Sequence, residues 1–153
     1  MNPWLRRLQL VLTIGGGFAG LAVSFDTMSD SFRQSVPNGL IIVPAALYFL
    51  SAIVIGLRLA EDRASRRSLL WLYGVQVPLL SSPVIAYRLS LGAHAYVGVL
   101  GDSFYWHFQF GDLYRVNLGN GDLPWGVGVN LFGLAMYLIT RRTMPSNNRW
   151  RGP

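Results

Sequence analysis

Four uncharged stretches dominate the pattern of hydrophobic and polar positions along the chain. They cover Leu8–Phe25, Gln34–Leu57, Ser68–Tyr87 and Leu123–Thr140, and each is 18 to 24 residues long. A bilayer core of about 30 Å is crossed by about 20 helical residues, so each stretch is long enough to span a membrane. The stretches are apolar all round rather than along one stripe, which favours lipid over a soluble core as their surroundings.

We therefore predict an all-α membrane fold with a small β element. Spanning helices are expected at about residues 6–25, 37–58, 68–88 and 123–141, and together they would form a four-helix transmembrane bundle in one domain, residues 1–153. Pro78 and Pro83 make the third helix the least regular one.

Glycines in the first stretch predict a helix contact. Gly16 and Gly20 lie four residues apart, on one face of the expected helix. Small residues at this spacing let a second helix backbone approach closely. The second helix could belong to this chain or to a partner.

The N-terminal region also has a second interpretation. Arg6 and Arg7 precede the apolar stretch, and the small residues Ala22 and Ser24 lie near its end. This order of features occurs in secretory signal peptides, whose removal would leave three of the four predicted spans.

Residues between the third and fourth stretches alternate with period two. Every even position from Ser103 to Phe110 is aromatic, namely Phe104, Trp106, Phe108 and Phe110. Strict alternation indicates a strand with one buried face. With a strand on either side, this segment predicts a three-stranded antiparallel meander over residues 95–119, outside the membrane.

The alternation of apolar and polar positions predicts the register of this meander, because apolar residues should face one another across neighbouring strands. A two-residue turn at Gly101-Asp102 sets Val99 opposite Phe104, so that apolar residues meet. A three-residue loop after the second strand likewise sets Phe108 opposite Val116. The aromatic face could be covered by helix ends, by the lipid interface or by a partner, and the four aromatic residues are candidate partner contacts.

Charge sets the predicted topology. All 13 cations are arginine, and with both termini in the cytoplasm ten arginines and two acids lie inside, against three arginines and five acids outside. This distribution follows the positive-inside rule. It explains the net charge of +6 without nucleic acid and predicts contacts with membrane lipids in a bacterial inner membrane.

Catalytic constellations are missing from the sequence. The chain has no cysteine, and its two histidines, His94 and His107, do not form a recognisable metal motif. We predict no cofactor and no metal. A ligand pocket at the outer leaflet remains an alternative, and it would use Arg88, Asp102 and His107.

The sequence favours a non-catalytic membrane protein that acts as an accessory subunit or interaction module. Its partner would be another membrane protein or a second copy of the chain. A small membrane enzyme or lipid-binding protein is the first alternative, and an oligomeric channel is the second.

Overall fold

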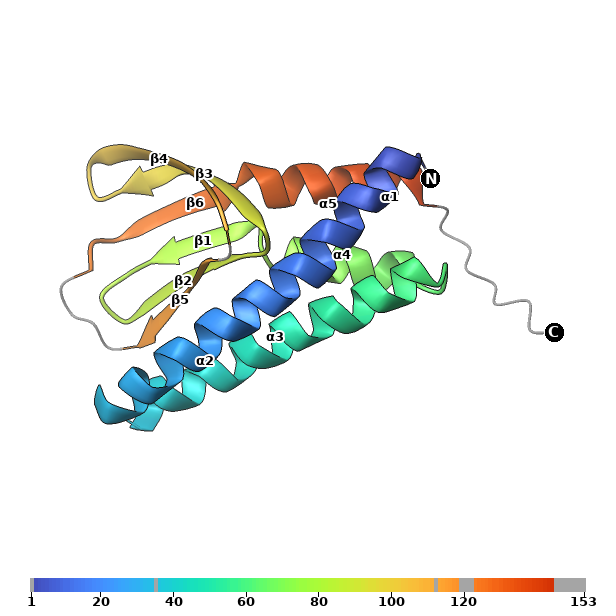
Figure 1. The fold of residues 1–153 in the computed structure, drawn as a ribbon. Helices are drawn as coiled ribbons and strands as arrows, with labels where there is room; N and C mark the ends of the chain where they lie inside the picture. The colour runs from blue at the N-terminus through green and yellow to red at the C-terminus, as the bar shows by residue number, and fades with distance from the viewer. Residues whose placement is uncertain (1, 35, 112, 119–122, 145–153) are drawn as a thin grey trace.

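A long helical hairpin runs the length of the molecule, and a sheet and two short helices lie against it (Figure 1). This arrangement comes from a computed structural model that describes residues 2–34, 36–111, 113–118 and 123–144. Helix α1 (Pro3–Leu10), the π-helical segment η1 (Val11–Gly15) and α2 (Gly16–Gln34) form one rod, and α3 (Val36–Ala60) returns beside it. The short helices are α4 (Arg66–Gly74) and α5 (Leu131–Thr143).

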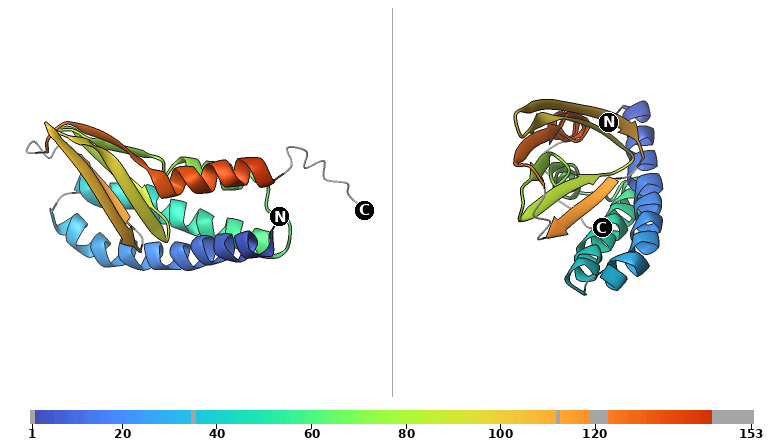
Figure 2. Two further views of the ribbon diagram at one scale, coloured as in Figure 1. Left: turned by 90° about the horizontal axis from the view of Figure 1, so that it is seen from above. Right: turned by 90° about the vertical axis from the view of Figure 1, so that its left-hand side faces the viewer.

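In the described ranges, six antiparallel strands form one sheet. They are β1 (Pro78–Ser81), β2 (Ile85–Ser90), β3 (Ala93–Leu100), β4 (Ser103–Phe110), β5 (Leu113–Leu118) and β6 (Gly126–Asn130), in the order β4-β3-β6-β1-β2-β5. Figure 2 shows the sheet at one end of the hairpin and α4 and α5 at the other.

The predicted four-helix transmembrane bundle and the all-α membrane fold are wrong. The fold is α/β, because the third and fourth uncharged stretches each divide into a short helix and a strand. Pro78 cannot donate a backbone hydrogen bond to a continuing helix, and β1 begins at this residue. In β6, Gly126 and Gly128 alternate with valines, a pattern that disfavours helix and suits a strand.

Two buried amide side chains fix these helix–strand junctions. Gln76, just after α4, donates to the Leu72 carbonyl at 3.0 Å and accepts from the Leu91 backbone N–H at 3.0 Å. Asn130, at the end of β6, accepts from the Ala95 N–H at 3.1 Å. Each amide is almost fully buried, so these bonds satisfy groups that water cannot reach.

Among the described residues, two helical segments are long and apolar enough to cross a membrane. They are Pro3–Asp26 and Ile42–Ala60, which correspond to the first two predicted spans. The third and fourth predicted spans are wrong, because neither is a continuous helix.

The prediction for the outer strands is partly confirmed. Strands β3 and β4 pair in the expected register, with Val99 opposite Phe104. The three-stranded meander is wrong, because β5 pairs with β2 instead of β4 and sets Val116 opposite Tyr87. Asp112, in the predicted second turn, and the end of the meander at residue 119 lie outside the described residues.

Candidate interaction surface and polar face

Strand β4 is an uncovered edge of the sheet. The opposite edge, β5, lies against α2 and α3, whereas β4 pairs with β3 alone among the described strands. Seven of its eight residues are exposed, and Tyr105 is half-buried. Strand β4 therefore offers one free edge and most of its two faces to a partner.

Four aromatic side chains lie exposed on one face of β4. Phe104, Trp106, Phe108 and Phe110 are 53–75% exposed, and we call them the aromatic surface. The sequence predicted these residues as partner contacts. No other described element covers them, so the alternative of a cover by helix ends does not apply.

The apolar character of this face continues across the sheet. In the row that contains Phe104, the opposed residues of β3 and β6 are Val99 and Val127. Both valines are also exposed, at 49% and 64%. An apolar patch that extends over several strands is typical of an interaction surface rather than of ordinary protein surface.

The other face of the sheet is polar and strongly curved. The Arg88 Nη1 of β2 donates to the Tyr105 hydroxyl of β4 at 3.3 Å, and its guanidinium carbon lies 5.2 Å from the centre of the tyrosine ring. Three strands separate β2 from β4, which in a flat sheet would place them about 19 Å apart. The contact therefore requires the sheet to roll with this face on the concave side.

Glycines allow this curvature. Gly98 of β3 lies directly opposite Gly128 of β6, and both lie between Tyr105 and β1 in the same row. A Cβ atom added at Gly98 would collide with the Val127 carbonyl and the Gly128 Cα. Without side chains here, the concave face has room for Arg88 and Tyr105 to meet.

Two histidines stack on the concave face. His94 is buried, its Nδ1 shares a hydrogen bond of 3.1 Å with the Ser90 hydroxyl, and its ring centre lies 5.5 Å from that of His107. Burial lowers the pKa of His94 from its usual 6.5, and the nearby charges of His107 and Arg88 lower the pKa further, against a smaller opposing effect of the Gly111 backbone. His94 is therefore neutral at pH 7.

The structure brings together part of the predicted ligand pocket. Arg88 and His107 both lie on the concave face, connected through Tyr105, whose ring stacks with His107 at 6.3 Å. Asp102 lies apart from them in the exposed β3–β4 turn. In the searched part of the chain, no three metal-binding side chains converge.

Sequence reasoning named Arg88 and His107 as pocket candidates but missed the contacts that Tyr105 and His94 make on this face. Tyr105 and His107 occupy the odd positions of the alternating segment, so the period-two pattern already assigned them to the face opposite the aromatic residues. The pattern could not reveal that this face is concave, since that depends on the position of β2 in the sheet.

The predicted glycine contact lies inside the chain. Gly16 and Gly20 are buried, and a Cβ added at Gly20 would overlap the Phe49 ring of α3. At Gly16 the added atom would come within 3.0 Å of the Gly92 nitrogen and the Leu91 side chain. The elements that approach these glycines closely are therefore α3, at Gly20, and the β2–β3 link, at Gly16.

The helical hairpin has polar residues inside and apolar residues outside. Gln9, Thr13 and Ser24 of the first rod are 0–1% exposed. The Gln9 amide donates to the Thr140 hydroxyl of α5 at 2.8 Å. Apolar side chains on the outer surface of the hairpin are 41–77% exposed, and they comprise Trp4, Leu8, Val11, Phe18, Val23, Phe25, Val43, Leu47, Leu50, Val54 and Leu57.

Comparison of the chain with protein-family models, curated proteins and solved structures found no match.

Proposed function

We propose that this chain is a non-catalytic interaction module, anchored by its helical hairpin in a bacterial cytoplasmic membrane, that binds a protein partner through β4. The observation that carries the proposal is an uncovered edge strand with four exposed aromatic side chains. Its free backbone groups would pair with an extended segment of the partner, and its aromatic side chains would pack against that segment.

Strand β4 lacks the features that normally prevent edge pairing. Natural edge strands carry lysine, proline or a bulge, or they are short. All eight residues of β4 pair with β3 in one continuous register, and none is charged or proline. Such an edge would promote aggregation in a monomer, which supports a role in binding a partner.

The outer surface of the hairpin supports the membrane anchor. On α3, the exposed apolar residues Val43, Leu47, Leu50, Val54 and Leu57 follow one another at steps of four and three, and so form a single outward stripe. A core helix of a soluble protein would turn such a stripe inward and its polar residues outward. A lipid environment gives this stripe the apolar contacts that water does not.

The arginines support the orientation of the anchor. The start of α1 and the end of α3 lie at one end of the molecule, together with the start of α4 and the end of α5 (Figure 1). Eight described arginines belong to this end, namely Arg6, Arg7, Arg58, Arg63, Arg66, Arg67, Arg141 and Arg142. By the positive-inside rule this end faces the cytoplasm, and β4 faces the opposite side.

The proposal is tested by purifying the full chain in mild detergent and measuring the mass of the complex. A stably bound polypeptide in addition to this chain is the expected result. The double variant Trp106→Ser/Phe108→Ser should accumulate normally and lose the partner, because both rings lie outside the core.

The matched control is Val84→Ser/Trp125→Ser. Val84 and Trp125 are 67% and 71% exposed, and neither belongs to β4. This variant should retain the partner. Loss of the partner in both variants, or in neither, would contradict a specific role of β4.

A further inference from the structure

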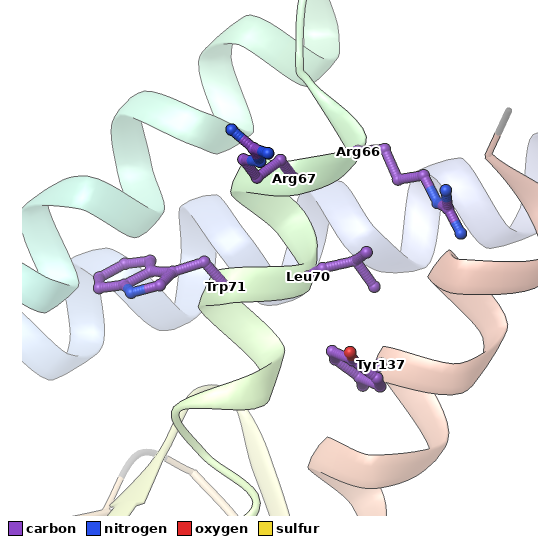
Figure 3. A pocket seen from close by; sticks show the side chains of 5 residues that line it. All are labelled: Arg66, Arg67, Leu70, Trp71 and Tyr137. Atoms are coloured by element: carbon purple, nitrogen blue, oxygen red, sulfur yellow. The ribbon is translucent and has the colours of Figure 1, made fainter. Parts of the chain in front are cut away.

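A cleft lies between α4 and α5 at the arginine-rich end of the molecule. It has a volume of about 510 Å³ and is lined by Arg66, Arg67, Leu70, Trp71 and Tyr137. Figure 3 shows the two arginines on the first turn of α4, Leu70 and Trp71 one turn further, and Tyr137 on the neighbouring helix. We call it the arginine cleft.

Within the described part of the chain, the arginines of this cleft have no acidic partners. The neighbouring acids are used elsewhere, since Asp62 pairs with Arg6 at 2.9 Å and Glu61 pairs with Arg63 at 3.4 Å. Among the described residues, neither Arg66 nor Arg67 has an ion-pair partner. The cleft therefore has two guanidinium charges that protein carboxylates do not neutralise.

One of these arginines is held in place and incompletely bonded. Arg66 Nη2 donates to the carbonyl of Arg141 in α5 at 2.8 Å, which fixes the side chain across the gap between the helices. Its Nε atom is buried and has no hydrogen-bond partner within the described part of the chain. A buried donor without a partner is unfavourable unless a ligand supplies an acceptor.

The far side of the cleft is apolar and aromatic. Trp71 is 51% exposed although its ring also contacts Tyr48, with the ring centres 6.0 Å apart. Leu70 and Tyr137, which also line the cleft, are half-buried and lie on the other side of α4 from the Trp71 ring (Figure 3). Polarity thus changes along the cleft from two cations to an apolar wall within about one helical turn, or 5.4 Å.

We infer that the arginine cleft binds the headgroup of an anionic phospholipid. Guanidinium groups donate paired hydrogen bonds to phosphate oxygens, and the apolar wall would contact the glycerol backbone and the first carbons of an acyl chain. Basic pockets between helices at the cytoplasmic surface of a membrane select such lipids. This inference rests on the anchor proposed above, which places the cleft at the cytoplasmic interface.

The test measures lipid retention by the purified full chain in neutral detergent, using native mass spectrometry. The probes are phosphatidylglycerol and phosphatidylcholine in equal amounts. We expect preferential retention of phosphatidylglycerol by about tenfold, and near-equal retention by Arg66→Gln/Arg67→Gln. Equal retention of the two lipids by the unmodified chain would overturn the inference.

Two further variants control for charge and folding. Arg58→Gln/Arg142→Gln removes the same charge from exposed positions outside the cleft and should keep the preference. Arg66→Lys/Arg67→Lys keeps the charge and the fold but loses paired hydrogen bonding, so its preference should fall by about threefold. An unchanged preference in the lysine variant, or an equal loss in the exposed-site control, would overturn the inference.

Competition separates a lipid headgroup from a free phosphate ester. Dihexanoyl phosphatidylglycerol should displace the bound lipid, whereas glycerol 3-phosphate at the same concentration should not, because it cannot contact Trp71. Displacement by both would assign the cleft to a free phosphate. Lipid preference without a bound protein would contradict the β4 proposal alone, and a bound protein without lipid preference would contradict the cleft alone.

Discussion

Arg88 and Tyr105 join opposite sides of the sheet across its concave face. The hydrogen bond of 3.3 Å between them closes a row that also contains Gly98 and Gly128. The pair holds the uncovered β3–β4 hairpin toward the rest of the sheet, and so sets the position from which the aromatic surface is presented.

Removal of the Tyr105 hydroxyl should weaken this closure. Tyr105→Phe loses the hydrogen bond but keeps the ring beneath the guanidinium, and we expect a loss of about 1 kcal/mol in the free energy of unfolding. Tyr105→Leu also loses the ring contact and should cost about 1 kcal/mol more. Denaturant unfolding in detergent provides the measurement. In an Arg88→Met background the Tyr105→Phe effect should vanish, and an unchanged effect there would show that the two side chains are not coupled.

Burial of His94 predicts a dependence of stability on pH. Its pKa is lowered in the folded chain, so the unfolded chain binds a proton more readily below the usual pKa of 6.5. Stability should therefore be full above this pH and decline as the pH falls below it. The midpoint of thermal unfolding, measured from pH 8 to pH 5, tests the direction.

Two histidine variants isolate this effect. His94→Gln should flatten the decline, because the titrating group is gone. His107→Gln should keep most of it, since burial of His94 is a larger cause of its pKa shift than the charge of His107. A decline of equal size in His94→Gln would assign the pH dependence to other groups.

Local patterns predicted the structure best where adjacent residues determine it. The alternation at 103–110 and the Gly101-Asp102 turn were sufficient for the β3–β4 register, which the structure confirms. The first two uncharged stretches likewise correspond to helices that pass the length and apolarity test for spanning a membrane. In both cases the structure is decided by contacts between residues that lie close together in the sequence.

The remaining fold depends on distant partners. Ser68–Tyr87 is uncharged, and this suggested one helix, but Pro78 and the pairing of β1 with β6, almost 50 residues later, convert its second half to strands. Strand β5 had apolar residues suited to β4, yet equally suited to β2, and a sequence pattern cannot choose between two matching partners. The hydrogen bond between Arg88 and Tyr105 was missed because the two side chains meet only through this strand order.

Gly20 should tolerate no side chain. A Cβ atom there would overlap the Phe49 ring, so Gly20→Ala must separate α2 from α3. We expect a loss of about 1–3 kcal/mol in the free energy of unfolding, measured in a mixed-micelle denaturation series. If Gly20 were instead a contact for a partner helix, the alanine variant would lose the partner without loss of stability.

Gly15 provides the matched control for this substitution. It lies five residues earlier in the same rod, and an added Cβ meets nothing within 4 Å. Gly15→Ala should be neutral or stabilise the helix by up to about 1 kcal/mol, since alanine has the higher helix propensity. A similar loss of stability in both variants would contradict the role of Phe49.

The orientation of the hairpin is tested by single cysteines, because the chain has none of its own. Glu61→Cys marks the α3–α4 turn and Asp102→Cys marks the β3–β4 turn, and both positions are exposed. In intact cells a membrane-impermeant maleimide should label only the cysteine at position 102, and lysis should make both positions reactive. Labelling at position 61 alone would reverse the orientation and place β4 in the cytoplasm. Labelling at neither position in intact cells would mean that both turns lie on the cytoplasmic side, which is incompatible with a hairpin that crosses the membrane.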